Sequence, residues 1–142
     1  MPVLTLFFAA AAALVNAWLG IRCGQVRIKE KISHGDGGNM LLQRRMRAQL
    51  NFAENTPGIL ILFLALELAG FSALMLEIVA VAYVIARICH GLGMDAETDS
   101  KLRGVGVMVS MLTVLVLSIS AIYVGYSLLG TGDLSTSLPT TI

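Results

Sequence analysis

The sequence is poor in charge, in aromatic residues and in cysteine. Asp, Glu, Lys and Arg make up only 13% of its 142 residues, whereas an average soluble domain has about 25%. So little charge cannot cover the surface of a water-soluble globule of this size. Disorder is also excluded, because disordered chains lack the apolar residues that form 56% of this one. The composition therefore predicts an integral membrane protein.

The same scarcities exclude several kinds of partner. A net charge of +1 gives no overall basic field for nucleic acid. Two cysteines, Cys23 and Cys89, are too few for a disulfide framework. The two histidines, His34 and His90, form no zinc-binding spacing with them, so we expect no metal site.

The chain does contain four apolar stretches of the length that a bilayer-spanning helix needs, about 20 residues. They cover residues 3–21, 48–70, 73–92 and 105–129. The first lacks the basic start of a signal peptide and is too long for one, and no stretch alternates with the period of a barrel strand. We predict an all-α integral membrane protein, a single domain over 1–142 with four transmembrane helices in a left-handed antiparallel bundle. With their flanks, the helices are expected at about 3–28, 39–70, 73–93 and 103–129, followed by a polar tail at 130–142.

The distribution of positive charge predicts the orientation in the membrane. All ten Lys and Arg residues lie in or beside the first and third connections, and neither the second connection nor either tail has any. Because positive charge marks the cytoplasmic side, we expect these two loops in the cytoplasm and both termini outside, in a multi-pass protein of a bacterial inner membrane. Asn39 and Ser72 are expected to cap the second and third helices.

One polar stripe descends into the second apolar stretch. Arg44, Arg47, Asn51 and Glu54 are 3, 4 and 3 positions apart, which places them on one face of a helix. Glu54 lies more than a turn inside the apolar stretch, where an ionisable group costs about 2.5–3.5 kcal/mol if central and needs partners. Two interpretations stay open: a structural ion pair between Arg47 and Glu54, or a site for a polar ligand.

Further cations lie at the cytoplasmic ends of the other helices. Arg87 and His90 are neighbours on the third helix, and Arg103 begins the fourth, where its charge opposes the helix dipole. A structural explanation stays open for each residue. Arg87 would reach lipid headgroups, His90 would form a hydrogen bond with the backbone, and Arg103 would help to set the orientation in the membrane. Joined by Arg27 and by Glu54, the set suits a small zwitterionic ligand, because arginine forks bind carboxylates and a glutamate binds an ammonium. The apolar walls leave room for a lipophilic second substrate.

Three motifs resemble one known family. They are Gly24-Gln25-Val26-Arg27, then Arg47, Asn51 and Glu54 at a fixed spacing, and Arg87-Ile88-Cys89-His90 with Arg103 thirteen positions on. On these residues the chain resembles the MAPEG superfamily, membrane-associated proteins in eicosanoid and glutathione metabolism. Microsomal glutathione transferases and microsomal prostaglandin E synthase belong to it, and the Gly-Asp-Gly-Gly loop resembles its bacterial members. Gly104 and Val107 depart from the synthase pattern, where serine and tyrosine stand.

The resemblance implies a homotrimer that holds glutathione between neighbouring subunits near the cytoplasmic side. Contacts to glutathione are implied for Arg27, Arg47, Asn51, Glu54, His90 and Arg103, and the residue chemistry adds Arg87. Arg103 is implied to stabilise the glutathione thiolate. We therefore expect a glutathione-dependent membrane transferase or peroxidase acting on a lipophilic electrophile. The alternatives are a small transporter with Glu54 as a proton-coupled cation site, and a catalytically silent membrane scaffold of the same family.

Overall fold

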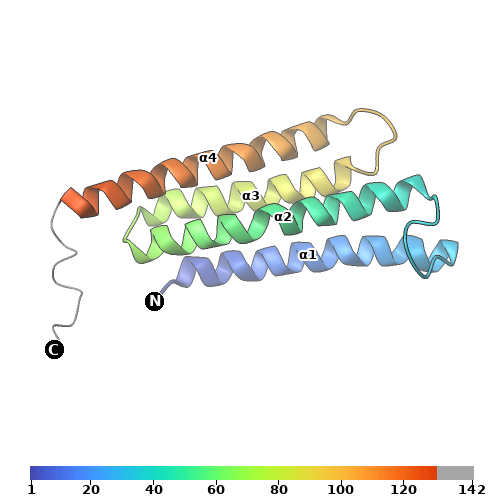
Figure 1. The fold of residues 1–142 in the computed structure, drawn as a ribbon, viewed down its shortest axis with the longest axis horizontal. Coiled ribbons are helices and arrows are strands. Elements are labelled where there is room, and N and C mark those ends of the chain that lie inside the picture. The colour runs from blue at the N-terminus through green and yellow to red at the C-terminus, as the bar shows by residue number, and fades with distance from the viewer. Residues whose placement is uncertain (131–142) are drawn as a thin grey trace.

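Four long helices lie side by side in a computed structural model of the chain, which describes residues 1–130 (Figure 1). Their bounds are α1 Val3–Glu30, α2 Met40–Leu68, α3 Ala73–Gly93 and α4 Lys101–Gly130. The two longer loops lie at one end of the bundle, and the N-terminus and the α2–α3 turn lie at the other. No strand occurs in the described part. The predicted all-α membrane bundle is thus confirmed, while all but the first residue of the expected polar tail lies outside the described residues.

Three of the helices, α1, α3 and α4, are long and apolar enough to cross a membrane. The helix α2 has 29 residues, but the polar residues of its first half lower its hydropathy. Since α2 lies alongside the other helices over its whole length (Figure 1), it brings these polar groups into an otherwise apolar bundle. The chain is an integral membrane protein.

The helix ends follow local chemistry. The side chain of Asn39 accepts a hydrogen bond from the backbone N–H of Leu42 (2.9 Å) and caps α2 as expected. Ser72 occupies the N-cap position of α3 as expected, but its side chain makes no capping hydrogen bond. At the far end of α2, the carboxylate of Glu67 accepts hydrogen bonds from the N–H groups of Leu4 (2.8 Å) and Thr5 (2.7 Å). It thereby caps α1 from another helix.

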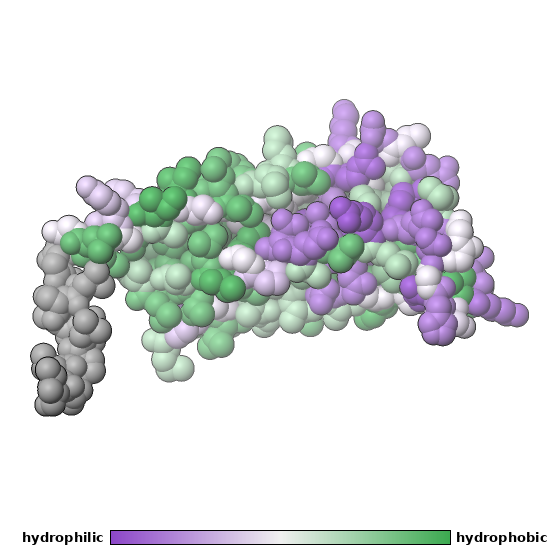
Figure 2. All heavy atoms as spheres, in the orientation of Figure 1, coloured by the Kyte–Doolittle hydropathy of each residue, from purple (hydrophilic) through white to green (hydrophobic). Residues whose placement is uncertain are grey.

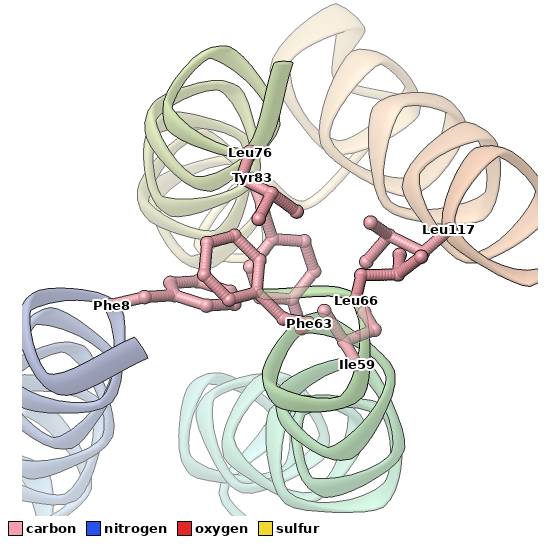
Figure 3. Packing of buried hydrophobic residues seen from close by; sticks show 7 residues of the cluster. All are labelled: Phe8, Ile59, Phe63, Leu66, Leu76, Tyr83 and Leu117. Carbon is pink, nitrogen blue, oxygen red and sulfur yellow. The ribbon is translucent and has the colours of Figure 1, made fainter. Parts of the chain in front are cut away.

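Residues from all four helices form the core near the end that carries the N-terminus (Figure 3). The ring of Phe8 lies 4.8 Å from that of Phe63 and 5.8 Å, edge-on, from that of Tyr83. Leu117 of α4 closes the cluster. The Tyr83 hydroxyl and Thr56 share a hydrogen bond of 2.8 Å, which satisfies two buried polar groups at once.

Two glycines let α3 and α4 meet backbone to backbone. A Cβ added at Gly106 would lie 2.6 Å from the carbonyl oxygen of Ala86 and 2.6 Å from the Cβ of His90. A Cβ added at Gly93 would overlap the backbone nitrogen of Arg103. This close approach fixes where α4 begins relative to the last turn of α3.

Candidate functional site

A polar groove opens between α1 and α2, in the half of the bundle nearer the two longer loops. Its volume is about 820 Å³, and Arg27, Asp36, Gln43 and Arg47 are among its lining residues. Gly24 contributes no side chain, and a Cβ there would meet nothing within 4 Å. The groove is therefore open, and its rim carries two guanidinium groups.

Few of the charges on this rim are neutralised within the chain. Arg27 donates one hydrogen bond to the sulfur of Met46 (3.4 Å). The carboxylate of Asp36 accepts hydrogen bonds from the N–H of Gly38 (2.9 Å) and from the amide of Gln43 (2.7 Å). These two bonds hold the pKa of Asp36 below its ordinary value. The groove thus has charged groups of both signs at neutral pH.

The polar stripe of α2 continues from the groove onto an outward face. Arg47 and Glu54 are exposed, and Asn51 is half-buried between them. Among residues 1–130, these three side chains make no hydrogen bond or ion pair. The structural alternative, an ion pair between Arg47 and Glu54, is therefore wrong. Figure 2 shows the hydrophilic surface gathered at the loop end and continuing as a band along part of the bundle.

Arg87 and His90 point into the bundle instead. Arg87 is only 1% exposed, so it does not reach the lipid headgroups. Its guanidinium lies 5.6 Å from the ring centre of Phe52, and Nη1 is 3.4 Å from the hydroxyl of Ser110. The Nε and Nη2 atoms of Arg87, and Nδ1 of His90, are buried and have no hydrogen-bond partner among residues 1–130. Neither residue lines the groove.

Arg103 lies in the first turn of α4, and its guanidinium is engaged. Nη2 donates to the carboxylate of Asp99, at 2.5 Å. Asp99 is fully exposed and Arg103 about one-third exposed. An exposed pair of this kind contributes little energy, so Arg103 remains available to another anion.

A partly buried charge cluster joins α1, α2 and the α3–α4 loop at this end. The carboxylate of Asp95 binds Arg22 (2.6 Å) and Arg45 (2.8 Å), and Arg22 also donates to the carbonyl of Gly91 (2.7 Å). Burial alone would raise the pKa of Asp95, but the hydrogen bonds and charges of the two arginines hold it below its ordinary value. We call Arg22, Arg45 and Asp95 the clamp. No spacing in the sequence indicated it, although Arg45 is one position off the polar stripe.

The sequence profile of the MAPEG family matches residues 5–123, which is most of the chain and reaches from the first turn of α1 into α4. The chain belongs to the MAPEG family. No curated protein matches the sequence. Members of the MAPEG family use glutathione as a cosubstrate in membrane transferase and related reactions, so membership assigns this chain a glutathione-related membrane function at the family level.

A single MAPEG subunit does not gather the seven expected residues into one pocket. The groove contains Arg27 and Arg47, the outward face of α2 carries Asn51 and Glu54, and the remaining three residues, Arg87, His90 and Arg103, lie on α3 and α4. The close contact of Gly93 with Arg103, and of Gly106 with His90, keeps two of the last three near one another. The sequence predicts the residue types of the site. It does not predict the helix rotations, which place these residues on different faces of the bundle.

Proposed function

We propose that this protein is a glutathione-dependent membrane transferase or peroxidase acting on a lipophilic electrophile. One observation carries the proposal: Arg47, Asn51 and Glu54 line one face of α2 without any partner among the described residues. Polar groups at membrane depth are costly without partners, and such residues mark functional sites. Glutathione has two carboxylates, an ammonium and a thiol, which complement this set.

The site we propose lies between subunits of a homotrimer, because one chain leaves the stripe on its surface. A second copy against this face would shield Glu54 from lipid and enclose the ligand. Arg27 and Arg47 would bind the carboxylates of glutathione through their forks, and Glu54 would bind its ammonium. Asn51 would accept or donate further hydrogen bonds, whereas Arg87 and His90 are both enclosed in the bundle. Arg87 would act through its packing on Phe52, and His90 through its contact with Gly106 of α4.

The chemical demand on the site is to form a thiolate. An unperturbed thiol has a pKa of about 8.5, so only a few per cent is ionised at pH 7. A guanidinium beside the sulfur favours the anion, and each unit of pKa lowering corresponds to about 1.4 kcal/mol. Arg103 is the candidate, because Asp99 holds it only weakly and it lies at the N-terminus of α4.

The reaction would then proceed at the border between groove and bilayer. In conjugation, the thiolate sulfur forms a bond to an electrophilic carbon while the leaving group departs with the bonding pair, and the thiol proton goes to solvent. In peroxide reduction, two glutathione molecules become a disulfide while the peroxide becomes an alcohol and water. The two cytoplasmic loops would face the glutathione pool, which follows from their positive charge.

Isothermal titration of the detergent-solubilised protein with glutathione tests the site. We expect Arg47→Ala and Glu54→Ala each to weaken binding about 10- to 100-fold, because each loses a hydrogen bond between charged groups. Lys29→Ala and Glu97→Ala remove the same charges from exposed positions and should leave the affinity unchanged. Unchanged affinity in both site variants would refute the proposal.

The thiolate role needs a separate comparison of binding with turnover. We expect Arg103→Ala to lower conjugation of 1-chloro-2,4-dinitrobenzene far more than it lowers glutathione affinity. An equal loss in both would remove the thiolate role from Arg103. A wild-type protein that binds glutathione but turns over neither this electrophile nor a hydroperoxide would be the silent scaffold.

A further inference from the structure

A second groove lies toward the opposite end of the bundle, between α1 and α3. Its volume is about 520 Å³, within the range of small-molecule sites. Phe63 of α2 is among its lining residues, and so are Phe8, Ala11 and Val84. Within the described range 1–130, the lining has a single ionisable side chain, the carboxylate of Glu77. This groove shares no lining residue with the polar groove between α1 and α2.

Glu77 has no partner to explain its presence there. It lies in the second turn of α3, inside a helix apolar enough to cross a membrane. It is exposed and makes no hydrogen bond or ion pair with any residue of the described range 1–130. The N-terminal dipole of α3 reduces the cost of its charge but supplies no donor in contact with it. An unpaired carboxylate on a helix of this hydropathy, beside an apolar groove, marks a candidate site for a cationic ligand.

The groove has a polar end and an apolar end. The helices α1 and α3 run in the same direction, since both begin at the end of the bundle that carries the N-terminus (Figure 1). Leu4 lies in the first turn of α1 and Glu77 in the second turn of α3, and Ala11 and Ile85 lie seven and eight residues further along their respective helices. That difference is about 12 Å of helix rise. The carboxylate therefore stands near the membrane surface, and the apolar walls continue toward the bilayer centre.

We propose that this groove binds an amphiphile with a protonated amine as its head. The ammonium would pair with the carboxylate of Glu77, and the hydrocarbon chain would lie along the walls formed by Phe8 and Val84. This charge complementarity selects amines over anionic amphiphiles, which the unpaired carboxylate would repel. Two sources share the chemistry: an ethanolamine lipid of the bilayer, and a free lipophilic amine.

Native mass spectrometry of the whole protein, released from detergent, tests the proposal by counting retained ligands. The probes are phosphatidylethanolamine and phosphatidylglycerol with identical chains, and dodecylamine with dodecanol. We expect the wild type to retain an amine probe in preference to its matched partner. Glu77→Gln should weaken retention about three- to tenfold, as expected for losing one ion pair near an apolar wall.

Two further variants separate this site from general lipid adhesion. Glu97→Gln removes the same charge from the exposed α3–α4 loop and should retain the amine probes as the wild type does. Ala11→Phe fills the groove without changing charge and should abolish retention, with its helix content checked by circular dichroism. Retention of phosphatidylethanolamine alone identifies the lipid as the ligand, and retention of dodecylamine alone identifies a free amine.

Three results would overturn the proposal. The first is equal retention of the amine probes and their matched partners by the wild type. The second is undiminished retention by Glu77→Gln. The third is a change in the number of subunits per complex in Ala11→Phe, which would show that a second copy of the chain fills the groove.

Discussion

At the scale of single residues, Arg103 is divided between two anions. Its guanidinium binds Asp99 in this structure, and the proposed reaction needs it beside a thiolate. An exposed ion pair contributes about 0.2–1 kcal/mol, so a bound thiolate can compete with Asp99 for the guanidinium of Arg103. Pairing with Asp99 therefore weakens the proposed stabilisation of the thiolate by Arg103.

We expect Asp99→Asn to strengthen that role. Without the competing carboxylate, the thiolate fraction of bound glutathione near pH 7 should rise about two- to fivefold, which corresponds to the energy of an exposed pair. The ultraviolet absorbance of the thiolate measures this fraction directly. Glu97→Gln removes a negative charge from the same loop and serves as the control. A lower thiolate fraction in Asp99→Asn would show that Asp99 assists Arg103.

The clamp gives the loop end of the bundle a defined pH dependence. The pKa of Asp95 is below its ordinary value of about 3.9 in the folded protein. The stabilisation from Asp95 is therefore fully present above that ordinary value and is lost as the pH falls through the lower, folded pKa. We therefore expect Asp95 to contribute nothing to the pH dependence of the free energy of unfolding between pH 5 and 8, because this range lies above the ordinary carboxyl pKa. Thermal unfolding at several pH values measures this.

Removing the carboxylate charge at neutral pH should reproduce the loss. Asp95→Asn leaves the buried Arg22 and the half-buried Arg45 without their counter-ion, and we expect about 2 kcal/mol of destabilisation. The exposed Glu97→Gln should change stability by less than about 0.5 kcal/mol. If thermal unfolding of the two variants coincides, the clamp contributes nothing to stability.

At the scale of elements, the contact of α3 with α4 depends on glycine. Gly106→Ala would place a methyl group 2.6 Å from the carbonyl oxygen of Ala86, so α4 must move outward. We expect about 1–3 kcal/mol of destabilisation, as for other overpacked sites. Gly125→Ala is the matched control on the same helix, because a Cβ there meets nothing within 4 Å. Equal stability of the two alanine variants in thermal unfolding would contradict this account of the packing.

At the scale of the whole molecule, the unpartnered face of α2 predicts association. We expect native mass spectrometry to find complexes of about three times 15.1 kDa with few monomers. Replacing Glu54 by leucine makes this face apolar, and we expect the complex to persist while glutathione binding is lost. A wild-type protein that remains monomeric at all concentrations would contradict an intersubunit site.

Much of this fold can be predicted from the sequence, because a bilayer allows only a few kinds of spanning structure. Apolar stretches of sufficient length give four helices, and a short connection around Phe71 and Ser72 makes α2 and α3 antiparallel neighbours. A charged residue inside an apolar stretch, such as Glu54, or at the edge of one, such as Arg47, is easily found. The long helices run close to the expected bounds, with α1 and α4 slightly longer than expected.

The sequence does not predict in the same way which distant residues pair with one another. Arg44, Arg45 and Arg47 look alike in sequence, yet Arg45 binds Asp95 through two nitrogens and Arg47 binds nothing in the described chain. The rotation of α2 decides this, and packing against three other helices sets that rotation. The sequence does not predict the inward direction of Arg87 for the same reason, because a cation near a helix end is as compatible with the surface as with the interior.

The carboxylate of Glu67, which caps α1, has a consequence for biosynthesis. The first turn of α1 leaves the ribosome early, but its capping group lies more than sixty positions further along the chain. Until α2 packs against α1, these two N–H groups lack the carboxylate that caps them. Their protection from hydrogen exchange therefore reports on whether the α1–α2 pair has closed.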